Sequence, residues 1–444
     1  MSFILRHRYA ALIVAVLIPR LAWFALLGGT LPEPVRDQVV YISAAGRIIT
    51  GEGLSFSRED GWLRHRMVTQ ESFRDTWAMD PDYIFGIIPV ETPTAAIEPG
   101  YPLMLACVFF VTGPFTGGVF LLNCLFALAG AWAVWTLVCE NWGERQGILA
   151  ALLWSVYPYY VYYSAYAMTE TVHFSLLPLI ALLTFRACRG RWSALLAGVS
   201  TGFLFLVRST ALFLLPLQTV WLFAKRKWRE ALLAACGFIL CCIPWVVRNQ
   251  IQLGSPVLMP TKGALNLWMR NNPDLLELEG IEIPGFVRES ISRRDLLEYP
   301  SMEGALTEVE RSDLLMERAR DFIMANPVLI AYLTVLRAGN FLSPAGATLD
   351  HPAVVLSGVL IYLPMLVLGI IEAVRRRRDG RILFLALTFL LYLALHSLAH
   401  GGVRYRLPVD MVLIVLASLF IGRRAGWEGP TGPVMVEDGD RVKE

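Results

Sequence analysis

Three acidic residues lie where an apolar stretch of the sequence meets a polar one. Asp37 follows the first apolar stretch, Glu98 stands directly before Pro99-Gly-Tyr-Pro102, and Glu170 follows the tyrosine-rich run 157–166. A carboxylate with an ordinary pKa is ionised at neutral pH and can accept a proton from a hydroxyl group as that hydroxyl reacts. Carboxylates also bind divalent cations such as Mg or Mn. We therefore take the three acids as candidate catalytic residues, with a divalent cation as a candidate cofactor.

Each acid also has a simpler interpretation. Asp37 lies in the first turn of a helix predicted between Pro34 and Gly51, where a negative charge complements the helix dipole. Glu98 fits a solvated loop end, and an acid at the mouth of a membrane segment, such as Glu170, commonly pairs with a nearby base. The sequence leaves both interpretations open.

Four arginines lie at the ends of apolar stretches. They are Arg208 in Val-Arg-Ser-Thr, Arg248 in Pro-Trp-Val-Val-Arg, and Arg404 and Arg406 in Val-Arg-Tyr-Arg-Leu-Pro. The planar guanidinium group suits a phosphate group, with which it forms paired hydrogen bonds. Alternatively, arginines at such boundaries extend toward lipid headgroups. Together with the acids, they indicate a binding site for the phosphate of a lipid.

The composition excludes a soluble enzyme of ordinary type. Of the 444 residues, 56% are hydrophobic and only 17% are charged, with a mean hydropathy of +0.53, whereas a globular domain has about 25% charged residues. The net charge of +2 does not indicate a nucleic-acid partner. The seven cysteines lie in or beside apolar stretches and predict no disulfide, and no carboxylate completes a zinc pattern with His396 and His400.

We expect an all-α polytopic membrane protein with about ten transmembrane helices, because about ten segments approach the roughly 20 residues that cross a bilayer. They are 9–28, 117–138, 147–165, 171–185, 192–207, 211–224, 231–247, 354–374, 382–399 and 407–421. Two further segments, 100–115 and 327–342, are short and begin with glycine or proline. If both also crossed, two of the basic clusters would move to the other side, against the positive-inside rule. We therefore predict that they are re-entrant or interfacial helices on the outer side.

This topology divides the chain into alternating membrane and polar parts. The predicted parts are a first span (1–29), an outer loop with interfacial helices and the first acids (30–116), helices two to seven (117–247), a second outer loop with an interfacial helix (248–352), helices eight to ten (353–422) and a cytoplasmic tail (423–444). The two outer loops contain enough aromatic residues to form small ordered caps. Function should therefore be sought on the outer face.

The order of these motifs resembles that of a known family, the C-type superfamily of polytopic glycosyltransferases that use polyprenyl-phosphate sugars. This superfamily includes protein O-mannosyltransferases and lipid A aminoarabinose transferases. The resemblance rests on Asp37-Gln-Val-Val-Tyr41, Glu98-Pro-Gly-Tyr-Pro-Leu103, Thr169-Glu170, Leu206-Val-Arg-Ser-Thr210, Pro244-Trp-Val-Val-Arg-Asn249, Asn266-Leu-Trp-Met-Arg-Asn-Asn-Pro273 and Arg404-Tyr-Arg-Leu-Pro408. One departure is Gln38, where many relatives have Glu.

The resemblance implies an inverting transfer of a sugar from a polyprenyl-phosphate donor to a hydroxyl of a lipid, glycan or protein acceptor. Asp37 would be the general base, and Glu98 and Glu170 would orient it, the acceptor or a metal. The four arginines would bind the donor phosphate. Residues that would contact the substrates are Tyr41, Tyr101, Tyr163, Asn266, Trp268 and Asn271.

The resemblance also implies a location and leaves two other functions open. The site would face the periplasm or exterior from a bacterial inner membrane, in contact with membrane lipids. The alternatives are a flippase or transporter of a lipid-linked sugar, and a polysaccharide polymerase or ligase that uses a diphosphate-linked donor. A transporter would place its charged groups near the membrane midplane and would show matched halves with broken helices.

Overall fold

The computed structural model describes residues 8–29, 32, 37–56, 92–113, 116–272, 283–291, 306–345 and 352–427. Within these residues the regular structure is helical, and the one β-type pairing is an isolated bridge between Ser55 and Pro93. The prediction of an all-α membrane protein is confirmed. Residues 57–91, which make up most of the first predicted cap, lie outside the described residues.

Seven helical segments of the described chain are long and apolar enough to cross a membrane. They are α2 (Arg8–Leu26), α8 (Thr116–Trp142), α11 (Thr169–Ala187), α14 (Trp228–Leu253), α20 (Pro352–Arg375), α21 (Gly380–Ala399) and the continuous segment Val403–Arg424, which is formed by α22 (Val403–Arg406), η2 (Leu407–Val409) and α23 (Asp410–Arg424). Their apolar lengths require burial in lipid or protein, so the chain is an integral membrane protein.

The other three predicted spans are helical but shorter. The segment 147–165 divides into α9 (Glu144–Val156) and α10 (Pro158–Tyr163), because Pro158 starts a new helix at its first turn. The remaining two are α12 (Arg191–Val207) and the continuous pair of η1 (Ser209–Phe213) and α13 (Leu214–Ala224). The extended residue Arg208 separates α12 from η1.

The two segments predicted to be re-entrant or interfacial are short helices beside the outer loops. α7 (Gly100–Thr112) packs against α3 (Asp37–Ile49), the helix predicted after the first span. α19 (Pro327–Leu342) meets α18 (Glu308–Ala325) at an angle of 101°, and Pro327 stands at the bend. The structure contains no membrane, so the depth of both segments stays a prediction.

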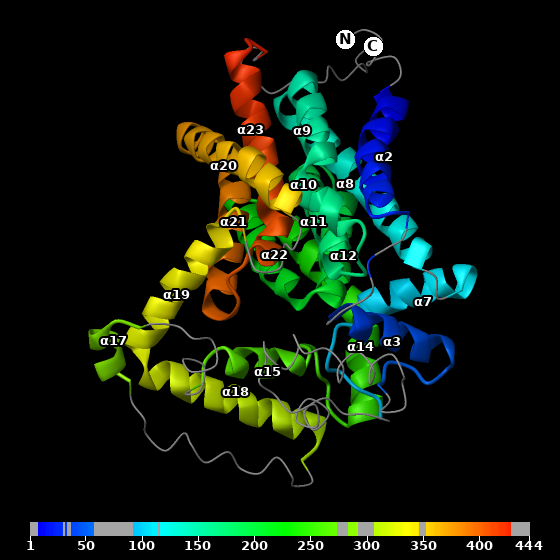
Figure 1. Cartoon of the computed structure of the whole chain (residues 1–444), viewed down its shortest axis with the longest axis vertical. Helices are drawn as coiled ribbons and strands as arrows, with labels where there is room; N and C mark the ends of the chain where they lie inside the picture. Colours follow the sequence, from blue (N-terminus) through cyan, green and yellow to red (C-terminus); the bar gives the residue numbers. More distant parts are fainter. Residues whose placement is uncertain are drawn as a thin grey trace, which may run out of the picture.

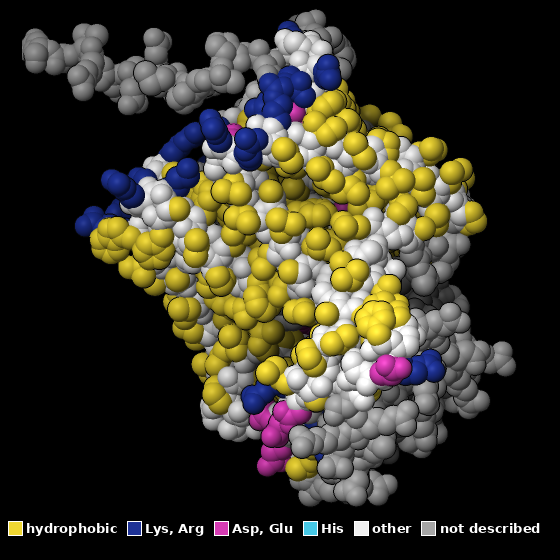
Figure 2. Space-filling model, turned by 90° about the vertical axis from the view of Figure 1, so that its left-hand side faces the viewer, with side chains coloured by type: hydrophobic (Ala, Val, Ile, Leu, Met, Phe, Trp, Pro, Cys, Tyr) yellow, Lys and Arg dark blue, Asp and Glu magenta, His cyan; other side chains and the backbone are white. Residues whose placement is uncertain are grey.

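Basic residues gather at one end of the bundle. Figure 2 shows Lys and Arg side chains collected at the upper end, above a broad hydrophobic surface. The turns 186–191, 225–229 and 375–381 and the end of α23 supply many of them. This is the end that the positive-inside rule predicts to face the cytoplasm, and that orientation stays a prediction.

A layer of helices, named the outer layer or α15–α18 layer because it belongs to the second predicted outer loop, lies across the opposite end. α15 (Lys262–Met269), α18 and the short α17 (Gly285–Glu289) lie below the bundle, and α19 connects this layer to the transmembrane helices (Figure 1). The layer has its own apolar core, separate from that of the bundle, which includes Trp268 of α15, Phe322 of α18 and Leu333 of α19. This core forms the second of the two predicted caps.

The packing of α12 on α14 depends on glycines spaced four residues apart. An added Cβ at Gly198 would lie 1.9 Å from the carbonyl oxygen of Ala234, and one at Gly202 would lie 2.8 Å from Cβ of Cys241. Small residues at this spacing let two membrane helices approach until their backbones touch. The close approach fixes the end of α12, and therefore Arg208, relative to α14.

We predict that Gly198→Ala lowers the stability of the protein by about 1–3 kcal/mol, because the new methyl group has no room against α14. Gly339→Ala in α19 is the matched control, since nothing lies within 4 Å of its added Cβ. The measurement is the thermal midpoint of each variant in detergent. Equal midpoints for the two variants would contradict this account of the helix pair.

Candidate active site

Two of the predicted acids and two of the predicted arginines form one charge cluster. The side chain of Glu170 is 0% exposed, and its Oε1 accepts hydrogen bonds from Arg208 Nη1 at 2.7 Å and from Nε of Arg404. Arg404 also reaches Asp37, with 2.9 Å between Nη1 and Oδ2. A single buried carboxylate therefore holds both arginines, and one of them extends to the second carboxylate.

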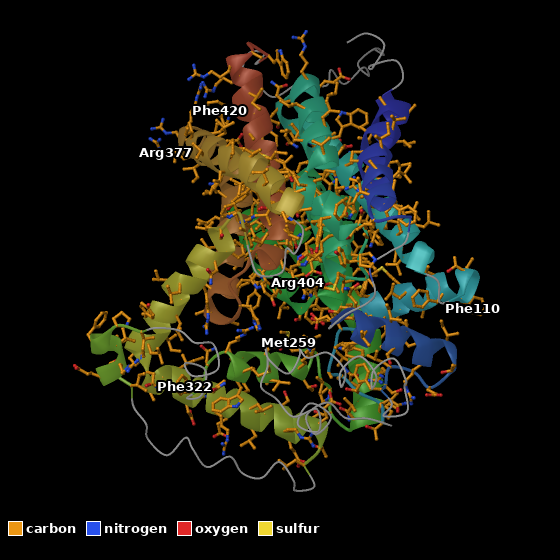
Figure 3. The ribbon with its side chains drawn as sticks, viewed as in Figure 1. Phe110, Met259, Phe322, Arg377, Arg404 and Phe420 are labelled. Atoms are coloured by element: carbon orange, nitrogen blue, oxygen red, sulfur yellow. The ribbon has the colours of Figure 1, made fainter. Side chains whose placement is uncertain are left out.

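The four side chains come from four separate elements. Glu170 lies in the first turn of α11, where the helix dipole favours a negative charge. Asp37 begins α3, and Arg208 is the extended residue that follows α12. Arg404 lies in α22, directly after two glycines. Figure 3 places it between the bundle and the α15–α18 layer, far from Arg377 at the basic end.

The approach of α22 requires Gly401. An added Cβ at this residue would lie 2.1 Å from the carbonyl oxygen of Arg337 in α19. A larger residue would therefore separate α22 from α19 and move Arg404. Of the two glycines in the Gly-Gly-Val-Arg-Tyr-Arg sequence, Gly401 therefore has a packing role beside the site.

Lys262 is a further cation of the cluster that the sequence reasoning missed. It is the first residue of α15, and its Nζ lies 3.5 Å from Oδ1 of Asp37. Lysine is rare in this chain, and Lys262 is the one lysine in the two predicted outer loops, 30–116 and 248–352. That rarity was a usable signal, although the sequence alone could not show which acid Lys262 meets.

These neighbours determine the protonation of Asp37. Burial raises the pKa of the Asp37 carboxyl, but the cations Lys262, Arg404 and Arg208 outweigh burial, so the pKa lies below its ordinary value. Asp37 therefore stays ionised as the pH falls, until the pH passes below this lowered pKa. One turn along α3, burial and the negative charge of Asp37 raise the pKa of Tyr41, which stays protonated.

Glu98 does not contact this cluster directly. Its Oε1 accepts a hydrogen bond of 2.7 Å from the backbone N–H of Ser209, the residue after Arg208. The contact fixes the turn from which Arg208 projects. Gln38, the departure from the family pattern, also has a structural role. Its Oε1 accepts a hydrogen bond of 3.2 Å from the backbone N–H of Ala167 and so joins α3 to the turn before α11.

The other two predicted arginines have structural partners. Arg248 donates to the backbone carbonyls of Thr94 and Leu54, at 2.7 and 3.0 Å, and so ties the two described pieces of the first outer loop to α14. Arg406 is fully buried, pairs with Asp410 at 2.9 Å, and stacks on the ring of Tyr362. Their role in phosphate binding stays a prediction.

The predicted substrate-contacting residues are divided between the bundle and the outer layer. Tyr41 and Tyr101 meet edge to face with ring centroids 5.2 Å apart, and both Tyr101 and Tyr163 are buried. Trp268 is buried in the core of the layer, and Asn271 donates to the carbonyl oxygen of Leu267 and accepts from Arg337. Asn266 is partly exposed on α15.

Tyr405 connects both arginines to the bundle. Its ring centroid lies 5.3 Å from the guanidinium carbon of Arg208 and 5.9 Å from that of Arg404. It also stacks on His396, with 4.9 Å between ring centroids, and lies 5.4 Å from His400. Cations over an aromatic face are attracted to it, so Tyr405 supports the two arginines from the side of α21.

The described residues contain no group of three or more His, Cys, Asp or Glu side chains placed to hold a metal ion. Of the two histidines that the sequence places four residues apart, His396 stacks on Tyr405 and His400 meets the same ring at a tilt of 47°. Burial and three nearby arginines, Arg270, Arg337 and Arg404, lower the pKa of His400 to about 3. An imidazole is neutral at any pH above its pKa, so His400 is neutral throughout the physiological pH range.

Comparison with known proteins finds one family model that matches part of the chain and several solved structures of similar fold. Residues 93–247 match the family model described as dolichyl-phosphate-mannose-protein mannosyltransferase. No curated protein matches the chain by sequence. The archaeal oligosaccharyltransferase AglB from Archaeoglobus fulgidus, solved with an inhibitory peptide and a dolichol-phosphate, is 13% identical with a TM-score of 0.55 over 95% of this chain and 50% of its own.

Two further structures resemble the chain. The Archaeoglobus fulgidus oligosaccharyltransferase in complex with Zn and sulfate is 13% identical, with a TM-score of 0.54 over 94% of this chain and 49% of its own. ArnT from Cupriavidus metallidurans, bound to undecaprenyl phosphate, is 12% identical, with a TM-score of 0.43 over 94% of this chain and 78% of its own. The chain spans about half the length of the archaeal enzymes, with which it shares a membrane fold.

We predict that Glu170→Gln destabilises the protein by about 3–5 kcal/mol, because it removes the buried negative charge that Arg208 and Arg404 share. Glu140→Gln is the matched control, since Glu140 pairs with Arg186 and both side chains are about a third exposed, so that its loss costs about 1 kcal/mol or less. Thermal midpoints of both variants test this difference. A Glu170→Gln protein as stable as Glu140→Gln would show that the cluster is not a structural requirement.

Proposed function

We propose that this chain, a polytopic membrane protein with the C-type glycosyltransferase fold, transfers a sugar from a polyprenyl-phosphate donor to a hydroxyl acceptor. One observation carries the proposal. An ionised carboxylate, Asp37, lies beside two arginines that share a buried partner, and Figure 3 shows one of them, Arg404, far from Arg377 at the basic end of the bundle. Such a group supplies a base and fixed cations at one place.

In the proposed reaction the acceptor oxygen attacks the anomeric carbon of the sugar while Asp37 takes the hydroxyl proton. The bond between that carbon and the phosphate oxygen breaks, and the polyprenyl phosphate leaves with the electron pair. Attack and departure occur on opposite faces of the sugar, so the configuration inverts. Asp37 is suited to the role because it is ionised and its side chain is 32% exposed, so an acceptor can reach it.

Arg208 and Arg404 would stabilise the negative charge that develops on the departing phosphate. Fixed cations are most effective when they need not reorganise during the reaction. Glu170 provides this rigidity, because it holds both guanidinium groups. Glu98 contributes indirectly through the turn that bears Arg208.

The charge of the cluster favours a monophosphate donor over a diphosphate donor. Among the described residues of the cluster, Arg208, Arg404 and Lys262 face two carboxylates, which leaves one positive charge in excess. A sugar linked through one phosphate carries one negative charge, whereas a diphosphate carries two. AglB, the archaeal enzyme of similar fold, was solved with a dolichol-phosphate, a lipid of the proposed class.

The location of the cluster favours a transferase over a flippase. Asp37, Glu170, Arg208 and Arg404 lie at element ends, and Figure 3 places Arg404 between the bundle and the α15–α18 layer rather than midway along the bundle. We place this end at the periplasmic or exterior face of a bacterial inner membrane, where the acceptor is a lipid, a glycan or a protein. A divalent cation, Mg or Mn, is the cofactor that a chelator would test.

We predict that Asp37→Asn reduces sugar transfer about 100-fold or more, because the amide cannot accept the hydroxyl proton. The measurement is release of labelled sugar from a synthetic polyprenyl-phosphate donor by purified protein in lipid, with and without chelator. Asp313→Asn, at an exposed acid on α18, is the control and should keep normal turnover. Near-normal turnover of Asp37→Asn would exclude Asp37 as the base.

We predict that Tyr405→Leu raises the KM for the donor about tenfold with a smaller effect on kcat, because both arginines lose the ring that supports them. Tyr405→Phe keeps the ring and should keep the wild-type KM. Steady-state kinetics at varied donor concentration compare the two. If Tyr405→Phe is as defective as Tyr405→Leu, the hydroxyl group is what matters and the positioning role is wrong.

A further inference from the structure

Both oxygens of the Asp37 carboxylate face a cation. Oδ2 lies 2.9 Å from Nη1 of Arg404, and Oδ1 lies 3.5 Å from Nζ of Lys262. The two cations come from opposite sides, Arg404 from the bundle and Lys262 from the outer layer. A carboxylate held in this way is a poor proton acceptor, so the ligand-free site holds its base in a weakened form.

The two cations differ in how firmly they are held. Arg404 is also bound to the buried Glu170 and lies over Tyr405. Lys262 has a flexible four-carbon side chain that is 26% exposed, and among the described residues Asp37 is its one ion-pair partner. A new anion at the site would therefore draw away Lys262 more readily than Arg404.

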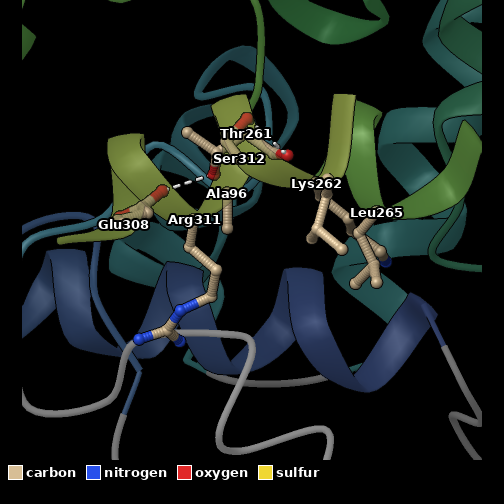
Figure 4. Close-up of a pocket in the computed structure, with 8 residues that line it drawn as sticks. Ala96, Thr261, Lys262, Leu265, Glu308, Arg311 and Ser312 are labelled. Carbon is tan, nitrogen blue, oxygen red and sulfur yellow. Dashed lines mark hydrogen bonds between the residues drawn. The ribbon is translucent and has the colours of Figure 1, made fainter. Parts of the chain in front are cut away.

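A hydrogen-bonded junction sets the position of Lys262. The backbone N–H of Thr261 donates to the carbonyl oxygen of Ala95 at 3.0 Å, and the N–H of Ala95 donates to Oε1 of Glu308 at 3.0 Å. The hydroxyl groups of Thr261 and Ser312 complete the junction (Figure 4). It joins the start of α15 to the start of α18 and to the loop that ends in Glu98.

This junction fixes the position of the Lys262 backbone relative to the turn that bears Arg208. In the loop that carries Ala95, the carbonyl oxygen of Thr94 accepts a hydrogen bond from Arg248. The carboxylate of Glu98, at the end of the same loop, accepts one from the backbone N–H of the residue after Arg208. The backbone of Lys262 is therefore fixed relative to the cluster, while its partly exposed ammonium group is held by one ion pair among the described residues. A fixed backbone and a flexible side chain would let the ammonium group of Lys262 exchange one anionic partner for another.

We propose that Lys262 is a further donor-binding residue of the site, which pairs with Asp37 while the donor is absent and with the donor phosphate once it is bound. The proposal rests on the proposed function. It makes donor binding the step that frees the base, so that proton transfer to Asp37 follows occupation of the phosphate site. The phosphate supplies the negative charge that replaces the carboxylate beside the ammonium group.

The test is a double-mutant cycle on binding of a polyprenyl monophosphate without sugar, measured with purified protein in lipid nanodiscs. Asp37→Asn should bind this lipid about tenfold more tightly, because Lys262 no longer has to leave a carboxylate. Lys262→Met should bind it about tenfold more weakly. In the Lys262→Met background, Asp37→Asn should gain about threefold or less. Lys225→Met, at the basic end of the bundle, is the matched control and should bind like wild type.

An equal gain from Asp37→Asn in both backgrounds would overturn the proposal, because Lys262 would then have no part in the exchange. So would an unchanged affinity for Lys262→Met. These outcomes are separate from failure of the proposed function. That failure would appear as binding that follows the cycle while no labelled sugar is released from any donor.

The pH dependence of transfer gives a second readout if a variant folds poorly. Among the described residues, the groups that face Asp37 are Lys262 of α15, Arg208 at the end of α12, Arg404 of α22, His400 before α22, and Tyr41 of α3. Activity is lost as the pH falls through the pKa of Asp37. Loss of Lys262 should raise that pKa and move the acid limb of kcat/KM toward higher pH by about one unit, whereas Lys262→Arg should restore it. An acid limb unchanged in Lys262→Met would contradict the proposal.

Discussion

The site depends on the burial of one carboxylate between two arginines. An acid in an apolar interior is unstable unless cations and hydrogen bonds surround it, and Glu170 meets this requirement with Arg208 and Arg404. The requirement brings together the start of α11, the end of α12 and the start of α22, which are far apart in the sequence. Other contacts support this arrangement, among them the Glu98 contact to the Arg208 turn and the stack of Tyr405 on His396.

The outer layer supplies the second half of the site. Its helices pack on each other through Trp268 and Phe322, and hydrogen bonds of Thr261 and Glu308 to the backbone of Ala95 join them to the first outer loop. Lys262 then reaches Asp37 from the side opposite Arg404. The base therefore lies at the boundary between a rigid bundle and a separately packed layer. A donor whose lipid lies in the membrane would approach the cluster from the side and meet cations from both parts.

The fold and the central acids could be predicted from the sequence. Long apolar segments and their basic flanks indicate membrane helices directly, and Asp37 and Glu170 stand where such segments end. The partners of each charge could not be predicted, because they depend on which helices meet. Arg248 and Arg406 look like Arg208 in the sequence, yet they bind backbone carbonyls and Asp410. Lys262 and Tyr405 join the site only through tertiary contacts, and much of the first cap lies outside the described residues.

The most direct test of the central claim compares two donors that differ in one phosphate. Purified protein in lipid would be given the same labelled sugar linked to the same polyprenol through a monophosphate or a diphosphate, together with a mixed pool of envelope acceptors. The single excess positive charge of the cluster predicts transfer from the monophosphate donor and little from the diphosphate donor. Transfer from the diphosphate donor alone would contradict the account, as would binding of both donors with transfer from neither.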